Sequence, residues 1–116
     1  HLLGLNEQYE IFTYVKDITG VIPPVIDAKD VLLNPRDVLN KLCNKLGIIF
    51  SEEMLSWSKG ERKTDGVWSK YWYKNVINST GFIAYREKEE EIPDNYLELY
   101  TECSRIYDSL HKHRIK

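Results

Sequence analysis

A polar segment in the middle of the chain has the residue types that bind an anion. Residues 58–66 carry three cations within five positions and a glycine near each end. The cations are Lys59, Arg62 and Lys63, and the glycines are Gly60 and Gly66. Lysine and arginine make charge-assisted hydrogen bonds to phosphate oxygens, glycine lets backbone amides approach a ligand, and a helix beginning just after this segment adds a favourable dipole. The pattern predicts a phosphate site, with a solvated basic loop as the alternative that composition alone also fits.

Four aromatic residues follow this loop on a helix that we expect to run from about residue 68 to 77. They are Trp68, Tyr71, Trp72 and Tyr73. Such rings can form a wall on which a base stacks, but aromatic side chains at helical spacing more often pack in a core. The spacing therefore favours core packing.

The other titratable residues give weaker signals. Asp27 follows the short apolar run Val25-Ile26, at the carboxyl end of an expected strand where α/β folds place functional groups, although a helix-capping or ion-pair role is equally ordinary. His111 and His113 lie two residues apart with no cysteine or carboxylate at ligand spacing, so no metal site is expected. The sequence also lacks the Walker-type, Gly-x-Ser-x-Gly and His-Glu-x-x-His patterns, so we assign no catalytic residue to this chain.

Length and composition limit the classes of protein to consider. The chain has 116 residues, which fits a single domain, and its formal net charge of −2 argues against general nucleic-acid binding. Its apolar runs reach four or five residues, far short of a membrane span. Cys43 and Cys103 lie 60 positions apart without metal spacing, which favours buried free thiols and a reducing, cytoplasmic location. Residues 1–4 show neither an initiator Met nor a signal pattern, so we expect an internal cut of a longer gene product.

Apolar spacing and capping residues predict a mainly helical chain. In the first half of the chain we expect a helix over 5–19 ended by Gly20, a very short strand at 25–26 and a helix from Asn34-Pro35 to Gly47. A short helix capped by Ser51 follows and carries Met54, Leu55 and Trp57. The second half contains the loop 58–66, the aromatic helix, a charged connector over 86–91 and a last helix opened by Pro93-Asp94. No second strand is evident, so the partners of the short strand are expected in sequence outside this chain or in another copy.

The order of these pieces resembles the carboxyl-terminal third of sulfotransferases. The segments that carry the resemblance are Pro23-Pro24-Val25-Ile26-Asp27-Ala28, Asn34-Pro35, Leu39-Asn40-Lys41-Leu42-Cys43-Asn44-Lys45-Leu46-Gly47-Ile48-Ile49-Phe50 and Met54-Leu55. The later segments are more similar to a sulfotransferase-like subfamily, and they run from Trp57 through Asp65-Gly66-Val67-Trp68, Trp72-Tyr73 and Ser79-Thr80-Gly81-Phe82. Lys59-Gly60 followed by Gly66-Val67-Trp68 is similar to the family's Lys-Gly-x-x-Gly-x-Trp loop, which grips the 3′-phosphate of the co-substrate 3′-phosphoadenosine-5′-phosphosulfate. The spacing is longer here and Ser58 stands where the family has Arg, so Arg62 or Lys63 is expected to take the place of that cation.

The resemblance implies a function for the whole chain. It implies an α/β P-loop nucleotide-binding fold with three layers, of which residues 1–116 form a mainly α-helical segment with one short strand. The cofactor-binding residues would be Lys59, Gly60, Arg62, Lys63, Gly66 and Trp68. The phosphosulfate loop and the catalytic base are expected upstream, so this segment binds the nucleotide and does not catalyse alone. Its partners would be the nucleotide, a missing amino-terminal portion or a second copy, with neither nucleic acid nor membrane.

Two other hypotheses stay open at this stage. A stand-alone helical protein-interaction module without nucleotide binding predicts that the edge at 25–26 and the aromatic faces are buried by self-association or by a partner. A small RNA-binding domain that stacks bases on Trp68, Tyr71 and Tyr73 is the third hypothesis, and the net charge argues against it.

Overall fold

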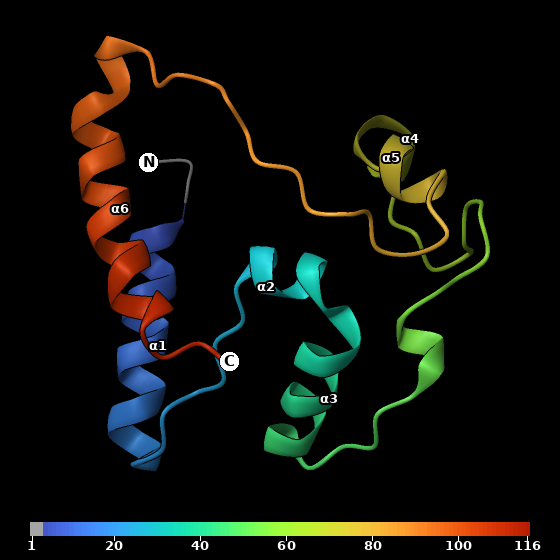
Figure 1. The fold of residues 1–116 in the computed structure, drawn as a ribbon, viewed down its shortest axis with the longest axis horizontal. Helices are drawn as coiled ribbons and strands as arrows, with labels where there is room; N and C mark the ends of the chain where they lie inside the picture. Colours follow the sequence, from blue (N-terminus) through green and yellow to red (C-terminus); the bar gives the residue numbers. More distant parts are fainter. Residues whose placement is uncertain (1–3) are drawn as a thin grey trace.

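The computed structural model describes residues 4–116 and shows helices joined by long irregular segments (Figure 1). The expectation of an internal cut concerns mainly residues 1–3, which lie outside the described part. The elements are α1 (Leu5–Thr19), α2 (Ala28–Leu33), α3 (Pro35–Leu46), the 3-10 turn η1 (Glu52–Met54), α4 (Ser69–Trp72), α5 (Lys74–Ile77), the 3-10 turn η2 (Asp94–Tyr96) and α6 (Leu97–His111). The prediction of a mainly helical chain is confirmed.

The two longest helices, α1 and α6, pack against each other although they lie at opposite ends of the sequence (Figure 1). Phe12 of α1 lies half-buried, and its ring centroid is 5.4 Å from that of His113, just after α6. The predicted row of Leu5, Tyr9 and Phe12 therefore faces inward in part. In the neighbouring apolar row, Ile11 and Ile18 are exposed and Val15 is half-buried.

The helices α2 and α3 form a second packed pair whose ends follow the sequence signals. Asn34 caps α3 by accepting a hydrogen bond from the amide of Asp37, Pro35 occupies the first turn, and Gly47 ends the helix. Cys43 is buried on this helix, and its Sγ lies 3.8 Å from the Sδ of Met54. The boundaries predicted for α3 are confirmed, whereas the six-residue helix α2 was not predicted.

Gly47 gives a direct test of this helix end. Its φ is +68°, a conformation that strains any residue with a Cβ, so Gly47→Ala is expected to lower the free energy of unfolding by about 1 kcal/mol. Gly66→Ala is the matched control, since Gly66 has open space around it and no positive φ. Urea denaturation followed by circular dichroism measures both variants, and equal losses would contradict the strain argument.

The predicted strand is reduced to a single parallel bridge between Val25 and Arg114. The amide of Ile115 donates to the carbonyl of Val25 at 2.8 Å. Pro23 and Pro24 lack amide hydrogens, so they cannot extend the ladder on the amino-terminal side. Within residues 4–116, Val25 is paired by the segment after α6, which corrects the expectation that every partner lies outside the chain.

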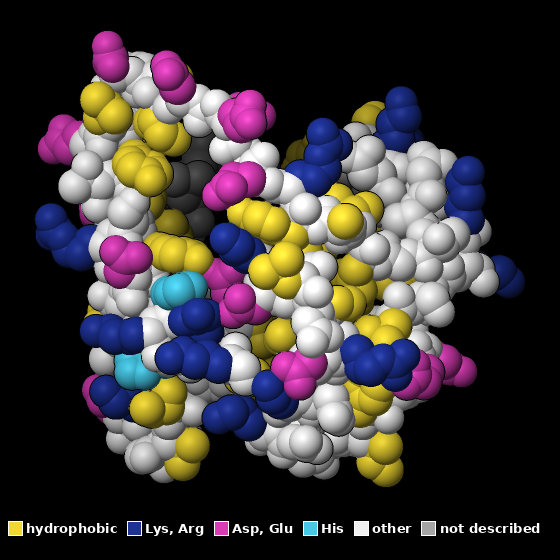
Figure 2. All heavy atoms as spheres, in the orientation of Figure 1, with side chains coloured by type: hydrophobic (Ala, Val, Ile, Leu, Met, Phe, Trp, Pro, Cys, Tyr) yellow, Lys and Arg dark blue, Asp and Glu magenta, His cyan; other side chains and the backbone are white. Residues whose placement is uncertain are grey.

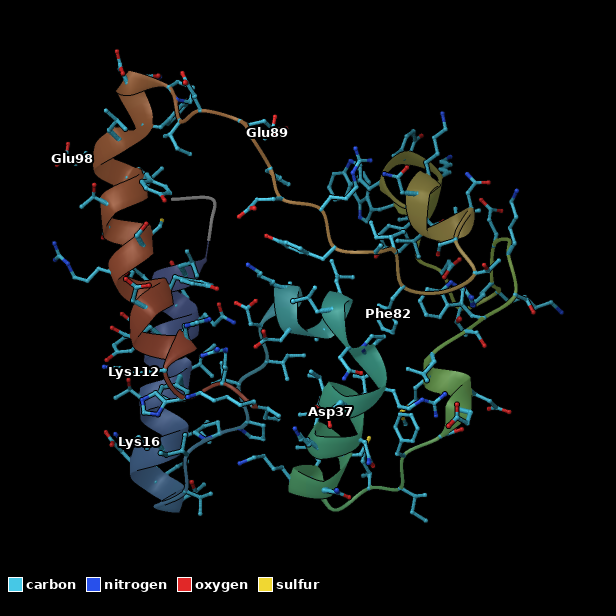
Figure 3. The ribbon with its side chains drawn as sticks, in the orientation of Figure 1. Lys16, Asp37, Phe82, Glu89, Glu98 and Lys112 are labelled. Carbon is cyan, nitrogen blue, oxygen red and sulfur yellow. The ribbon has the colours of Figure 1, made fainter. Side chains whose placement is uncertain are left out.

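Two predicted helices are shorter than expected. The aromatic helix breaks into the single turns α4 and α5 at Tyr73, whose ψ of 15° leaves the helical region, and a run of aromatic residues has modest helix propensity. The segment capped by Ser51 is only the turn η1, so Leu55 and Trp57 lie beyond its end. Residues 86–91 form no helix or strand and lie on the long segment between α5 and α6, on which Figure 3 marks Glu89.

Few side chains are buried for a chain of this length. The radius of gyration is 16.8 Å, against about 13 Å for a compact domain of this size. The buried apolar residues among those described are Val31, Val38, Cys43, Leu110 and Ile115. Cys103 is only partly buried, unlike the prediction for it. Many large apolar side chains therefore remain on the surface, and large exposed apolar patches mark interaction sites.

Within residues 4–116 no helix has the length and apolarity that crossing a membrane requires.

Candidate functional site

The start of the loop over 58–66 is hydrogen-bonded to the end of α5 and to the segment that follows α5. The amide of Trp57 donates to the carbonyl of Thr80 at 3.0 Å, and the amide of Gly60 donates to the carbonyl of Ile77 at 2.8 Å. Gly60 has φ of +120°, which a glycine adopts without strain and which allows this close contact. These two backbone hydrogen bonds fix the start of the loop, and they are called its fixed base below.

Side chains around Trp57 strengthen this base. The indole Nε1 of Trp57 donates to Ser79 Oγ at 2.9 Å, and that hydroxyl donates to the carbonyl of Val76 at 2.6 Å. The ring of Phe82 meets Trp57 edge to face at 5.4 Å, and Figure 3 marks Phe82 on the segment after α5. A bridge between Ser56 and Gly81 completes the contact.

The loop is also ordered by its own polar groups. The carboxylate of Asp65 accepts a hydrogen bond from the amide of Arg62 at 2.8 Å, and the Arg62 guanidinium donates to the carbonyl of Ser58 at 3.2 Å. Arg62 keeps further N–H donors for a ligand because a guanidinium has five. Lys59 and Lys63 are exposed.

The predicted site residues are neighbours along the chain, from the loop to the start of α4, and their backbone amides are less available to a ligand than their side chains. The amides of Gly60 and Arg62 are already hydrogen-bonded within the protein. The helix α4 is a single turn, so its dipole adds little. An anion at this loop would therefore be held mainly by the cationic side chains of Lys59, Arg62 and Lys63. Their role in binding a nucleotide stays a prediction.

The aromatic residues after the loop are on the surface, so the interpretation as core is wrong for the described chain. The exposed fractions are 58% for Trp68, 64% for Tyr71 and 75% for Trp72. Trp68 stacks on Trp72 with ring centroids 5.4 Å apart and 13° between the planes. The ammonium of Lys70 lies 4.9 Å from the centroid of Tyr71. These rings form an open aromatic surface beside the cationic loop.

A second polar cluster joins the start of α2 to the end of α6. Asp27 caps α2 by accepting from the amide of Lys29 at 2.8 Å, and it also accepts from the Tyr107 hydroxyl. His111 stacks on Tyr107, and its Nε2 lies 4.0 Å from the Asp27 carboxylate. Arg114 donates to the carboxylate of Asp30 at 2.8 Å. A helix cap or an ion pair was predicted for Asp27, and the structure shows the cap. Its contacts with Tyr107 and His111 could not be predicted, because residues about 80 positions away leave no local sequence pattern. In Figure 2, Lys, Arg and His side chains gather near this end of α6.

The hydrogen bond between Tyr107 and Asp27 changes the pKa of both groups. Burial raises the pKa of Asp27, but the Tyr107 hydroxyl, the Lys29 amide and nearby His111 together outweigh burial and lower it below the usual value. The same contact raises the pKa of Tyr107 to about 12. Asp27 therefore contributes stability above about pH 4, which is lost as pH falls through its lowered folded pKa. Tyr107 contributes stability below about pH 10, which is lost as pH rises through about 12.

We expect Tyr107→Phe to reduce the loss of stability on acidification. The variant removes the hydroxyl that favours the ionised carboxylate of Asp27, so its urea midpoint should fall less between pH 7 and pH 3 than that of the unmodified chain. Tyr100→Phe, on an exposed position of the same helix, is the matched control and should behave as the unmodified chain does. The same acid response in both variants would count against this linkage.

No group of three or more His, Cys, Asp or Glu side chains comes together as a metal site within residues 4–116. The closest such pair described above is Asp27 and His111, 4.0 Å apart, and Tyr107 contacts both by donating a hydrogen bond to Asp27 and stacking on His111.

Comparison with known proteins identifies the family. A family model described as a sulfotransferase domain matches residues 10–109, so the chain belongs to this sulfotransferase domain family. Two curated proteins from Arabidopsis thaliana are similar to it. Branched-chain-amino-acid aminotransferase-like protein 2 is 33% identical over 113 residues, and branched-chain-amino-acid aminotransferase-like protein 1 is 35% identical over 111 residues.

The matches cover nearly all of this chain but only a small part of each relative. They cover 97% and 96% of this chain, respectively, but 20% of each relative. The chain thus spans about a fifth of the length of the curated relatives it matches. No solved structure matches the chain significantly.

Proposed function

We propose that this chain is the carboxyl-terminal segment of a longer cytoplasmic sulfotransferase with a P-loop-type fold, and that it binds the 3′-phosphate of 3′-phosphoadenosine-5′-phosphosulfate. The observation that carries the proposal is the loop over 58–66, which lies inside the family match and presents Lys59, Arg62 and Lys63 from a fixed base. Three cations within five residues supply the charge-assisted hydrogen bonds that a phosphate requires.

The proposed reaction assigns different tasks to different parts of the parent protein. The acceptor oxygen or nitrogen forms a bond to sulfur, the bond from sulfur to the phosphate oxygen breaks, and the acceptor proton passes to a base. Such in-line transfer depends on positioning and charge neutralisation, as in phosphoryl transfer. The base and the phosphosulfate loop are assigned to sequence upstream of this chain. The loop over 58–66 anchors the nucleotide at its 3′-phosphate, away from the bond that breaks.

Calorimetric titration with adenosine 3′,5′-bisphosphate tests the proposal. We expect binding that weakens as salt rises from low to moderate concentration, because exposed cations are screened. Quenching of tryptophan fluorescence should accompany binding, since Trp68 lies beside the loop. If the isolated chain fails to bind and the full-length product binds, the site needs upstream groups as well. If neither binds, the proposal fails.

A stand-alone helical interaction module is the second candidate, and the extent of exposed apolar surface favours it. Tyr14, Ile18 and Val21 near the end of α1 and Ile49 after α3 are all more than half exposed. This hypothesis predicts a dimer or larger species by light scattering and no effect of the nucleotide. A monomer that binds adenosine 3′,5′-bisphosphate would exclude it.

A further inference from the structure

A groove runs between α1, the segment over 23–28 and the end of α6. It consists of two cavities, of about 280 and 210 Å³, which share wall residues. The shared residues are Gln8, Val25, Ile26 and Leu110. The two cavities therefore adjoin along these residues, and together they are called the groove here.

The two ends of the groove differ in chemistry. The larger cavity has an apolar lining, and the residues that belong to it alone are Ile11, Phe12, Val15, Pro23 and Pro24. The smaller cavity adds polar and titratable residues, among them Asp27, Tyr107, His111 and Arg114. A ligand that fits both ends must be apolar along its body and polar at one end.

The charges at the polar end favour a cation. The Asp27 side chain is only 9% exposed, and the ion-pair partner nearest to it is His111 at 4.0 Å. Arg114 is paired with Asp30 at 2.8 Å, so its charge is already balanced. The ammonium of Lys29 lies over the ring of Tyr85, 5.0 Å from the centroid, and so has its own partner. Since Arg114 and Lys29 each have a partner of their own, His111 is the cationic side chain left beside Asp27, and the Asp27 carboxylate presents negative charge to the groove.

The hydrogen-bonding capacity of Asp27 is not exhausted by its protein partners. Its carboxylate accepts from the Lys29 amide and the Tyr107 hydroxyl, and an ionised carboxylate has about four acceptor positions. An ammonium group can therefore pair with it. Such a contact inside a partly buried pocket is stronger than one on open surface, because water screens it less.

We propose that this groove binds a small amphiphilic primary amine, with the ammonium at Asp27 and the apolar body along Phe12 and Val15. The site lies on the α1–α6 side of the molecule, whereas the loop over 58–66 lies on the side of α4 and α5 (Figure 1). The inference therefore stands on different residues from the nucleotide proposal.

Calorimetry with 2-phenylethylamine as the probe tests the groove. We expect the amine to bind with millimolar affinity or tighter, 2-phenylethanol to bind more weakly, and 3-phenylpropanoate not to bind. Asp27→Asn keeps the size of the side chain and removes its charge, so it should weaken amine binding at least about tenfold while alcohol binding stays within about threefold, since a lost ion pair of this kind is worth 1.4 kcal/mol or more. Equal binding of the amine and the carboxylate, or no amine binding at millimolar concentration, would overturn the proposal.

A matched charge variant and a measurement on the unmodified chain distinguish loss of the site from misfolding or a general charge effect. Asp108→Asn removes one carboxylate from an exposed position of α6 outside both cavities, so amine binding should stay within about threefold of the unmodified chain. In the unmodified chain, amide NMR shifts on adding the amine should centre on Gln8, Ile26 and Leu110, with none at Gly60. Shifts elsewhere, or an equal loss of binding in Asp27→Asn and Asp108→Asn while circular dichroism shows folded chains, would refute a site directed by the charge of Asp27.

Discussion

Replacing Lys59 and Arg62 together with alanine is expected to weaken binding of adenosine 3′,5′-bisphosphate by about 10- to 100-fold. Each exposed cation supplies about 1 kcal/mol or somewhat more through a charge-assisted contact, and 1.4 kcal/mol corresponds to tenfold in affinity. The amides of Gly60 and Arg62 are used inside the protein, so they cannot compensate for the lost side chains. Titration calorimetry at low salt measures the change.

The control for this double variant must remove the same charge elsewhere. Lys16→Ala/Lys112→Ala does so on the α1–α6 pair, where Figure 3 marks both residues. This control lowers the net charge equally, so any loss that it shares with Lys59→Ala/Arg62→Ala reports the general field of the protein and not a site. We expect less than about a threefold effect for the control. Equal losses in the two double variants would remove the case for a phosphate site in this loop.

A further variant separates charge from loop structure. Arg62 also donates to the carbonyl of Ser58, so its removal can change the loop as well as its charge. Lys59→Ala/Lys63→Ala leaves that hydrogen bond in place, and neither lysine has a polar contact that orders the loop in the way that Arg62 does. A comparable loss of affinity in this variant would assign the effect to the cations themselves.

Local signals in the sequence were sufficient for the long helices. The start of α3 follows from Asn34 and Pro35, and the ends of α1 and α3 follow from Gly20 and Gly47, because caps and left-handed glycines act within one turn. The last helix could be predicted from its apolar spacing over four turns, and η2 precedes it at Asp94. Each of these features depends on neighbours within about four residues.

The features that were missed depend on distant or weak contacts. The helix α2 has only six residues, too few for a clear apolar period, and is capped by Asp27. The pairing of Val25 with Arg114 joins positions 89 apart, and a single bridge has no alternating pattern to reveal it. The break at Tyr73 was missed because the aromatic spacing continued through it.

The candidate site also has features that could be predicted from neighbouring residues and features that could not. That residues 58–66 form a polar loop followed by Trp68 could be predicted from composition, since cations, glycines and aromatic residues are adjacent in the sequence. The hydrogen bond from the amide of Gly60 to the carbonyl of Ile77 could not be predicted, because its partner lies 17 positions further along the chain. The exposure of Trp68 and Trp72 also departs from the usual fate of aromatic residues, which pack in a core when a core is present to receive them.

Leu110→Ala is expected to lower the free energy of unfolding by about 2–4 kcal/mol, the usual cost of truncating a buried leucine. Leu110 is one of the few buried apolar residues described, at 8% exposure, and its side chain lines both cavities between α6, α1 and the segment over 23–28. Leu97→Ala, in the first turn of the same helix, removes the same atoms from a side chain that is 47% exposed. That control should cost less than about 1 kcal/mol.

The expected loss for Leu110→Ala is large compared with the total free energy of unfolding of a small domain. Small domains are stable by about 5–15 kcal/mol, and a chain with so little buried apolar area is expected near the lower limit. Losing Leu110 should therefore remove a large share of the stability and loosen the packing of α6 against α1, because few other apolar side chains are buried. Urea denaturation followed by circular dichroism measures the loss. Similar losses for Leu110→Ala and Leu97→Ala would mean that the α1–α6 contact does not stabilise the isolated chain.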